Sequence, residues 1–282
     1  MTRLVEAQRI AVARLVEAGR TDSQAHYIVK LLLQHILETD AAGLIARAES
    51  QLSEEKLNAF YALALRAETQ PVHRLLGWRD FFGLRLRLSA ATLEPRDDTE
   101  ALVEAVLDTL PDKDAALRFA DLGTGTGAIA LALLSHLPNA VAIATDVDPQ
   151  AVATATENAM RLGFADRFQP AEGSWMEPLA GNFHFVVSNP PYIASDVIVR
   201  LHPDVCEYDP HLALDGGTDG LDAYRAILKD AASHLREDGF LALEIGYNQA
   251  EDVRELAESQ GWTIKGRHKD INGRNRVLIC VD

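Results

Sequence analysis

An asparagine, two prolines and a tyrosine follow an apolar run in the stretch 186–193, VVSNPPYI. Pro190 and Pro191 fix the backbone and cannot donate hydrogen bonds, so the Asn189 side-chain oxygen and the Pro190 carbonyl offer only acceptors at this point. We call these two oxygens the acceptor corner. A planar amino group would suit it, because accepting both hydrogens pulls the nitrogen toward tetrahedral geometry and aims its lone pair. Tyr192 could cover the flat face of such a substrate.

A purely structural turn is the alternative for this stretch. An Asn-Pro pair alone commonly ends a strand. The four residues 189–192 together, at a strand end and downstream of a glycine-rich turn, favour a substrate site.

The glycine-rich turn lies at 121–128, DLGTGTGA, where it follows a strand and opens a helix. Its central residues are Gly123, Thr124, Gly125, Thr126 and Gly127. The three glycines let the backbone turn tightly and approach a ligand closely. The motif alone leaves other interpretations open, because Gly123, Gly125 and Ala128 also satisfy the dinucleotide fingerprint of nicotinamide enzymes, and a tight turn can be purely structural.

Two acidic residues add information about the ligand of this turn. Asp146 ends the next strand, where a carboxylate can accept hydrogen bonds from both ribose hydroxyls of a nucleoside. Asp121 precedes the glycines, where its charge would repel a pyrophosphate and attract an amino group or a sulfonium. The two positions favour S-adenosylmethionine as the cofactor.

Both motifs belong to a pattern of alternating strands and helices that begins near residue 99. We expect strands at 117–122, 140–145, 183–188, 240–245 and 276–281. We expect helices at 99–110, 127–137, 220–235 and 249–260, and one between its N-cap Asp148 and Gly163 just past its end. This alternation predicts a mostly parallel α/β sheet with helices on both faces, which binds ligands beyond the carboxyl ends of its strands.

Residues 1–70 differ from this pattern, because their apolar residues recur at helical spacing throughout. Thr21 or Asp22, and then Ser53, are the expected N-caps. The segment has no polar cluster suited to catalysis. We therefore predict a small helical bundle that serves as a docking or lid module.

Residues 71–96 are predicted to form a linking hairpin after Pro71 closes the bundle. The segment 82–88 alternates leucine and arginine, as a half-exposed strand should. The arginines of the linking region are Arg74, Arg79, Arg85, Arg87 and Arg96. Runs of charged residues are usually exposed to solvent, so we favour a solvated strand face over a contact surface for the substrate. Residues 97–282 then form the catalytic domain.

Composition excludes several classes of protein. A formal charge of −15 argues against wide contact with nucleic acid. Cys206 and Cys280 lie far apart and the nine histidines form no H-x3-H pair, so we expect neither a disulfide framework nor a metal. The apolar stretches are too short to cross a bilayer and the first residues lack a signal-peptide core, which predicts a cytoplasmic protein without membrane contact.

The motifs together resemble those of the protein-(glutamine-N5) methyltransferases of the release-factor type, the HemK/PrmC family. The resemblance covers nearly the whole chain. Its segments are QPVHRLLGWRDFFGL at 70–84, EPRDDTEALVE at 94–104, DLGTGTGAIALAL at 121–133, SNPPYI at 188–193, YDPHLALDGGTDGLDAYRAI at 208–227 and KDINGRNRV at 269–277.

This resemblance implies a seven-stranded, Rossmann-like class I S-adenosylmethionine-dependent methyltransferase domain, and an N-terminal helical domain that helps to hold a peptide-chain release factor. The implied reaction is methyl transfer to the glutamine of the Gly-Gly-Gln loop of the release factor. The implied cofactor residues are the glycine turn, Asp146, Trp175 and Asn189, and the implied substrate motif is 189–192. Arg96 and Glu100 are possible substrate contacts.

The chain departs from the family pattern at three positions. Glu94 and Asp97 stand where relatives usually have an isoleucine and a second proline. Ser174 stands before Trp175 where an aspartate is common. The contacts made at these positions cannot be carried over from the family.

Three alternatives remain open. A DNA adenine-N6 methyltransferase would use the same Asn-Pro-Pro-Tyr motif to hold an amino group. The acidic charge of this chain and its lack of a long basic insert count against this alternative. A glutamine methyltransferase of a ribosomal protein is closer, and Thr99 and Glu100 at the end of the segment 94–100 favour a release factor over it. A nucleotide-binding scaffold or an NAD-dependent enzyme is the third alternative.

Overall fold

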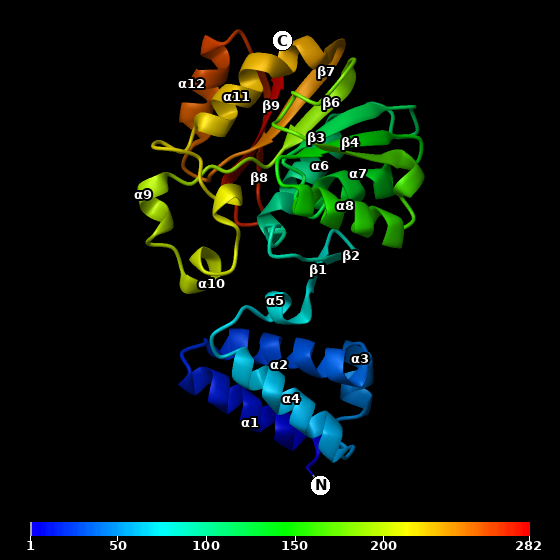
Figure 1. Cartoon of the computed structure of the whole chain (residues 1–282), viewed down its shortest axis with the longest axis vertical. Coiled ribbons are helices and arrows are strands. Elements are labelled where there is room, and N and C mark those ends of the chain that lie inside the picture. The colour runs from blue at the N-terminus through cyan, green and yellow to red at the C-terminus, as the bar shows by residue number, and fades with distance from the viewer. Residues whose placement is uncertain (1) are drawn as a thin grey trace. The chain divides into compact units, whose positions relative to one another are not determined.

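The computed structural model describes residues 2–282, which form two compact units that meet in sequence between Gly77 and Trp78. The first unit is helical and the second carries the large sheet (Figure 1). Among residues 2–282, no helix combines the length and the apolar character that crossing a bilayer requires.

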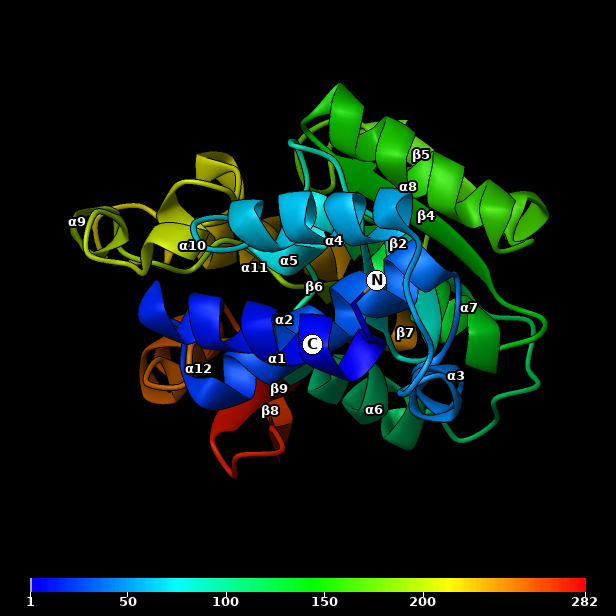
Figure 2. The same cartoon turned by 90° about the horizontal axis from the view of Figure 1, so that it is seen from below.

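The helical unit packs amphipathic helices around a small core. Its helices are α1 (Leu4–Glu17), α2 (Asp22–Leu37), α3 (Ala41–Ala46), α4 (Glu54–Arg66) and α5 (Val72–Leu76). Thr21 and Gln24 form a capping box at the start of α2, and Ser53 caps α4, so both expected caps are confirmed. Helices α1, α2 and α4 lie side by side in both views (Figures 1 and 2). They share a core that includes Leu15, Leu32 and Phe60.

The start of the predicted linking hairpin is helical in the structure. Pro71 does not close the bundle but stands at the N-cap of α5, a place where proline is tolerated because the first helical turn needs no backbone donor from it. Gly77, with φ of 72°, ends α5 in the left-handed conformation that suits glycine. A segment of five residues is too short to show the apolar spacing of a helix, so the sequence did not predict α5.

The hairpin itself is shorter than the predicted range 71–96. It consists of β1 (Trp78–Phe81) and β2 (Leu84–Arg87). Phe82 and Gly83 join the strands with φ of 48° and 78°. Positive φ at both central residues is typical of two-residue hairpin turns, because the twist of such a turn matches that of the paired strands. Leu86 is buried while Arg85 and Arg87 are exposed, which confirms the predicted alternation.

The second unit is built on one seven-stranded sheet. Its strands are β3 (Arg118–Leu122), β4 (Val141–Asp146), β5 (Phe168–Glu172), β6 (Phe183–Ser188), β7 (Leu235–Glu244), β8 (Thr263–Lys269) and β9 (Asn275–Val281). The strand order is β5-β4-β3-β6-β7-β9-β8, and β9 alone runs in the direction opposite to the other six strands. Phe119, Phe185 and Phe240 stack on three adjacent strands, with ring centroids 4.7 and 5.3 Å apart.

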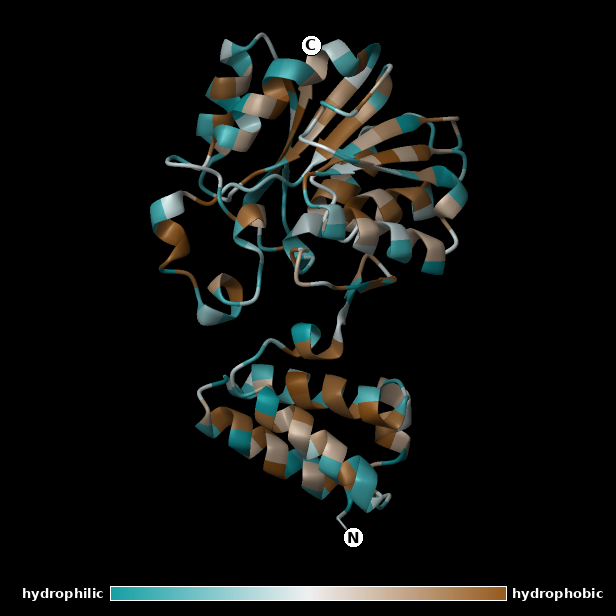
Figure 3. Ribbon diagram, in the orientation of Figure 1, coloured by the Kyte–Doolittle hydropathy of each residue, from teal (hydrophilic) through white to brown (hydrophobic). Residues whose placement is uncertain are grey.

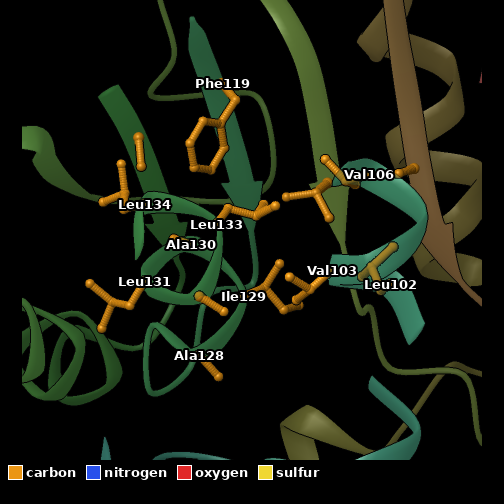
Figure 4. Close-up of a cluster of buried hydrophobic side chains, with 14 of the residues drawn as sticks. Leu102, Val103, Val106, Phe119, Ala128, Ile129, Ala130, Leu131, Leu133 and Leu134 are labelled. Atoms are coloured by element: carbon orange, nitrogen blue, oxygen red, sulfur yellow. The ribbon is translucent and has the colours of Figure 1, made fainter. Parts of the chain in front are cut away.

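Helices cover both faces of this sheet, as the alternating pattern predicts. They are α6 (Glu100–Thr109), α7 (Ala128–His136), α8 (Pro149–Arg161), α11 (Asp222–Ala231) and α12 (Ala250–Ser259). Helices α6, α7 and α8 cover one face, and α11 and α12 cover the other (Figure 1). The central strands are apolar, whereas the outer helices are mixed (Figure 3). Side chains of α6, α7 and β3 gather in one buried cluster (Figure 4).

Short helices complete the loops of this unit. They are α9 (Ser195–Ile198), α10 (Pro203–Cys206) and the 3₁₀ helices η1 (Asp97–Thr99), η2 (Ala165–Arg167), η3 (His211–Ala213) and η4 (Ala232–His234). Of these, η1 precedes α6 and η3 follows α10, and both contribute to the cavity described next.

Candidate active site

Parallel register brings the two sequence motifs to one edge of the sheet. Leu122, at the end of β3, pairs with Thr145 of β4 on one side and with Ser188 of β6 on the other. Residues 123–126 of the glycine turn follow β3, Asp146 ends β4 and Asn189 follows β6, and all of these residues line one cavity of about 430 Å³. A volume of this size suits a small-molecule ligand.

The backbone of β4 holds the glycine turn. The Thr145 carbonyl accepts hydrogen bonds from the backbone nitrogens of Gly123 and Thr124, both at 2.9 Å. The Gly125 nitrogen donates to Asp146 Oδ2 at 2.8 Å. Gly125 has φ of 57°, which glycine adopts without steric cost. Hydrogen bonds therefore hold the first and the second half of the turn against β4, the strand that carries Asp146.

Gly127 lies outside the cavity wall and has a packing role. It is the N-cap of α7, with φ of 81°. A methyl group at this position would lie 3.1 Å from Leu131 Cδ1 and 3.3 Å from Ala155 Cβ. Glycine thus lets α7 start close against α8.

Asp146 lines the cavity with both carboxylate oxygens partly engaged. Oδ2 accepts from Gly125, and Oδ1 accepts from the Asp148 nitrogen at 3.0 Å. Burial raises the pKa of Asp146, and these backbone hydrogen bonds act in the opposite direction. A carboxylate oxygen can accept more than one hydrogen bond, so Asp146 can still accept from a ligand.

Asp121 lies beneath the glycine turn and not on the cavity wall, which differs from the direct ligand contact expected from the sequence. Its Oδ2 accepts from the Thr124 hydroxyl at 2.7 Å and from the Ala130 nitrogen at 3.3 Å. Its Oδ1 is buried and has no hydrogen-bond partner within residues 2–282. The pKa of Asp121 is raised to about 7, mainly because the carboxyl group is buried. Asp121 therefore stabilises the turn through its hydrogen bonds with Thr124 and Ala130.

Trp175 gives the cavity a flat aromatic wall. A methyl group added to Gly123 would lie 3.5 Å from Cζ3 of the indole, so the ring lies close over the turn. Trp175 has φ of 44°, an uncommon conformation for a residue with a side chain. The Thr145 hydroxyl donates to the Trp175 carbonyl at 3.1 Å, which helps to hold this backbone in place. Ser174, one of the departures from the family pattern, also lines the cavity.

Asn189 projects from the end of β6 with a defined amide orientation. Its Nδ2 donates to the Thr99 hydroxyl of η1 at 3.1 Å. The side-chain oxygen is therefore the atom that can accept from a ligand. Pro191 lines the cavity, and Pro190 is buried behind it.

Two glycines and a glutamine hold the backbone of this motif. The Tyr192 carbonyl accepts from Gln249 Nε2 at 3.0 Å. A methyl group at Gly220 would lie 2.5 Å from the Tyr192 carbonyl oxygen, and one at Gly216 would lie 2.9 Å from the Pro191 carbonyl oxygen. Gly216 and Gly220 thus approach the motif too closely for a side chain at either position.

Tyr192 lies beside the cavity and points away from the position expected for a substrate cover. Its hydroxyl is 3.5 Å from Glu244 Oε1, at the end of β7. Burial, followed by the nearby Glu244 charge, raises the pKa of Tyr192 above its ordinary value. The structure therefore places the Tyr192 hydroxyl near the end of β7, and Tyr192 does not line the cavity.

The two possible substrate contacts have different positions. Arg96 lines the cavity and donates from Nη2 to Asp209 Oδ2 at 2.5 Å. Glu100 lies outside the wall, and its Oε1 accepts from the Phe82 nitrogen at 2.8 Å. Arg96 can reach a substrate, whereas Glu100 ties α6 to the turn of the hairpin.

The departures at Glu94 and Asp97 are explained by a single arginine. Arg79 of β1 donates from Nη1 to Glu94 Oε1 at 2.5 Å and from Nη2 to Asp97 Oδ1 at 2.6 Å. Arg85 pairs with Asp80 in the same hairpin. Arg85 is exposed, as predicted for a solvated strand face, whereas Arg79 is mostly buried and holds two carboxylates of this unit.

Sequence reasoning missed several residues of this site. They are Gly216, Gly220, Glu244 and Gln249, together with the cavity-lining Leu212 and Ala213. The double glycine of the segment 214–220, LDGGTDG, was an available signal within the segment 208–227 of the family resemblance, since adjacent glycines often mark a close backbone approach. In the described part of the chain, no group of three or more His, Cys, Asp or Glu side chains is placed to hold a metal ion.

Comparisons with known proteins agree with this geometry. Residues 97–202 match the family model of the Methyltransferase small domain, and residues 6–77 match that of the PrmC N-terminal domain. The chain is 41% identical to the Release factor glutamine methyltransferase of Agrobacterium fabrum, over 97% of this chain and 96% of the relative. It is 44% identical to the protein of the same name from Bradyrhizobium diazoefficiens, over 96% and 92%. The chain belongs to the release factor glutamine methyltransferase family.

Solved structures show the same fold at lower similarity. A methyltransferase from Pyrococcus furiosus is 19% identical, with a TM-score of 0.53 over 78% of this chain and 96% of the other. Membership of the family identifies the chain as a methyltransferase and confirms the predicted seven-stranded Rossmann-like fold. It also sets aside the alternatives of a nucleotide-binding scaffold and an NAD-dependent enzyme.

Proposed function

We propose that this enzyme transfers the methyl group of S-adenosylmethionine to the side-chain amide nitrogen of the glutamine in the Gly-Gly-Gln motif of peptide-chain release factors. One observation carries the proposal. The Asn189 amide is oriented by Thr99 beside a glycine turn and Asp146, in a single cavity of a chain that belongs to this family.

The residues of the cavity fit S-adenosylmethionine. Asp146 can accept from the ribose hydroxyls, and Trp175 offers a flat surface to the adenine. Gly123 and Gly125 leave room for the amino-acid part near the turn. The cofactor supplies a methyl group already activated on a sulfonium.

The acceptor corner prepares the substrate nitrogen. Because Thr99 takes the Asn189 amino group, the Asn189 oxygen is available to accept one hydrogen of the glutamine amide. The Pro190 carbonyl is the acceptor assigned to the other hydrogen, although Pro190 is buried and does not itself line the cavity. Holding both hydrogens weakens the delocalisation of the nitrogen lone pair and aims it at the methyl group. Orientation of this kind supplies up to about 7–11 kcal/mol of rate acceleration.

No strong base is needed in this mechanism. The amide nitrogen becomes acidic as it gains the methyl group, so one of the two protons held by the acceptor corner can leave to water. Asn189 and Pro190 therefore act by holding hydrogens and need not change their own protonation.

The charge and the helical unit support a protein substrate. A formal charge of −15 disfavours wide contact with DNA or RNA. The segment 2–77 is a compact unit with a core of its own, and residues 6–77 match the PrmC N-terminal domain. We assign substrate recognition to this unit and methyl transfer to residues 78–282.

Labelled methyl transfer tests the proposal directly. Purified release factors, ribosomal proteins and DNA are offered in parallel with radiolabelled S-adenosylmethionine, and a release factor with Gly-Gly-Ala in place of Gly-Gly-Gln is the matched control. We expect label only in the unaltered release factor. Label in a ribosomal protein or in DNA, with none in any release factor, would overturn the assignment.

A further inference from the structure

A buried ion pair lies where β8 and β9 are joined, in the segment 269–277, KDINGRNRV. This segment has no part in the steps derived above. The centre of the pair is Arg276 of β9, which is 5% exposed. The Asp270 side chain is fully buried, and its Oδ2 lies 3.0 Å from Arg276 Nη2. A buried charge is costly unless it is paired, so the fold must keep these two groups together.

The Arg276 guanidinium is held in a fixed direction. Asp270 Oδ2 accepts from Nε at 3.3 Å and from Nη2 at 3.0 Å, and the Ile245 carbonyl accepts from Nη1 at 3.3 Å. Asp270 is itself fixed, because its Oδ1 accepts from the backbone nitrogens of Asn272 at 2.9 Å and Arg274 at 3.0 Å. The loop between β8 and β9 and the residue after β7 therefore orient the guanidinium together.

The same guanidinium reaches η1. Arg276 Nη2 donates to Asp98 Oδ2 at 3.0 Å, and Asn272 Nδ2 donates to Asp98 Oδ1 at 3.4 Å. Asp98 is the middle residue of η1 and the neighbour of Thr99, whose hydroxyl accepts from Asn189 Nδ2 at 3.1 Å. Hydrogen bonds and one step along the chain thus connect Arg276 to the acceptor corner.

The helix η1 depends on contacts of this kind because it is short. It comprises three residues, and its N-cap residue Arg96 provides no side-chain cap. Hydrogen bonds in 3₁₀ helices have poorer geometry than those in α-helices. Asp97 also pairs with Arg79, but its side chain is 79% exposed, and exposed ion pairs contribute little. The Asp98 side chain is 35% exposed and meets an almost fully buried arginine, so its pair is better shielded from water.

We propose that Arg276 is a positioning residue, which acts through Asp98 to hold η1 where the Thr99 hydroxyl meets the Asn189 amide. The inference rests on the proposed function, because it concerns the same acceptor corner. Without the pair, the Thr99 hydroxyl is no longer held at hydrogen-bond distance from Asn189 Nδ2. The amide can then turn and present its amino group, a donor, where the reaction needs an acceptor.

Asp98→Ala tests this link and leaves the buried pair intact, because Arg276 keeps Asp270. We expect kcat toward the release factor to fall about 10- to 100-fold, since misplacement by about 1 Å can cost 10²-fold. The affinity for S-adenosylmethionine, measured by calorimetry, should change little, because Asp98 does not line the cavity. Asp98→Asn keeps an oxygen that can accept from Arg276, so it should retain more of the kcat. A wild-type kcat in Asp98→Ala would contradict the positioning role.

Asp97→Ala is the matched control. It removes a carboxylate from the same short helix and likewise leaves an arginine with its second partner, because Arg79 keeps Glu94. The pair that it breaks is exposed, so kcat should stay close to that of the wild type. Equal losses of kcat in Asp97→Ala and Asp98→Ala would show a general need for acidic residues in η1 and would refute the specific role of Arg276.

A double variant separates positioning from a merely structural role. Thr99→Val removes the hydroxyl that meets Asn189, so in this background the placement of η1 no longer reaches the amide. Thr99→Val alone should lower kcat at least as far as Asp98→Ala does, and adding Asp98→Ala to it should cause little further loss. Losses that multiply across the two changes would mean that they act independently, which would overturn the inference.

A final readout does not depend on the substrate. The side-chain amide of Asn189 gives a pair of nitrogen-correlated NMR signals, assigned by their loss in Asn189→Ala. We expect Asp98→Ala to shift or broaden these signals, while Asp97→Ala does not. Unmoved signals in Asp98→Ala would overturn the inference whatever the kcat. Moved signals in an enzyme that methylates no release factor would refute the proposed substrate and leave the positioning of the amide by Arg276 standing.

Discussion

At the level of single residues, cofactor binding should depend on Asp146. Its carboxylate lines the cavity and already holds Gly125 and Asp148, so it is fixed in place before a ligand arrives. Asp146→Ala should weaken S-adenosylmethionine binding by about 2–3 kcal/mol, since it removes a charged acceptor. Calorimetry measures this directly. An unchanged dissociation constant would show that the ribose is not held there.

Two buried carboxyl groups should make stability depend on pH. The pKa of Asp121 rises from 3.8 to about 7, and that of Glu244 rises from 4.5 to about 7. The folded protein therefore binds these protons more tightly than the unfolded chain, so the stabilisation is complete below the unfolded values and is lost as the pH rises through about 7. For Glu244 the change corresponds to roughly 3 kcal/mol.

Asp121→Asn and Glu244→Gln should each flatten this dependence. Urea unfolding at several pH values between about 5 and 8 gives the free energy of unfolding across the window in which the wild type loses stability. Two variants with the full wild-type slope would mean that neither carboxyl holds its proton in the folded state at neutral pH.

At the level of secondary structure, prediction succeeded where the chain carries its own signals. The strand β6 has the predicted bounds, 183–188, because a continuous apolar run marks a strand buried on both faces. The helix α8 begins after Asp148 as predicted, because its cap and first proline are local signals. The strands β5 and β8 lie at the two edges of the sheet and were missed, because their exposed residues interrupt any apolar run.

The sequence likewise predicted some parts of the site and missed others. The glycine turn and Asn189 sit at strand ends, and parallel register brings strand ends together, so their meeting in one cavity followed from the pattern. The contact between Thr99 and Asn189 joins residues 90 positions apart and depends on how η1 packs against β6. Glu244 looked like an ordinary strand-end residue until the structure placed it behind Tyr192.

The close approach of the segment 216–220 to the acceptor corner should be required for activity. Gly220→Ala would place a methyl group 2.5 Å from the Tyr192 carbonyl oxygen, so the backbone at 190–192 must shift. We expect a large loss of kcat. Gly163→Ala is the matched control, because Gly163 has a similar φ of 79° and open space around it, so it carries the same backbone strain of about 1–3 kcal/mol without the clash. Equal kcat values in the two variants would contradict the role of this contact.

At the level of the whole molecule, the two units should separate recognition from chemistry. The cavity residues all lie between 91 and 223, within the second unit. A fragment of residues 78–282 should therefore bind S-adenosylmethionine but methylate a release factor far less efficiently than the full chain. Calorimetry checks that the fragment is folded and binds, and steady-state kinetics gives kcat/KM. Equal kcat/KM for fragment and full chain would refute the recognition role of the helical unit.

The turnover number of Asn189→Ala on a release factor is the most direct test of the acceptor corner. Positive charge grows on the substrate nitrogen as the methyl group arrives, so its hydrogen bond to the Asn189 oxygen strengthens in the transition state and contributes to kcat. We expect kcat to fall by about 10²–10³, as on removal of a single preorganised polar group from an active site, with little change in S-adenosylmethionine affinity. A near-normal kcat in Asn189→Ala would make the Asn-Pro-Pro-Tyr motif a structural turn and contradict the proposed mechanism.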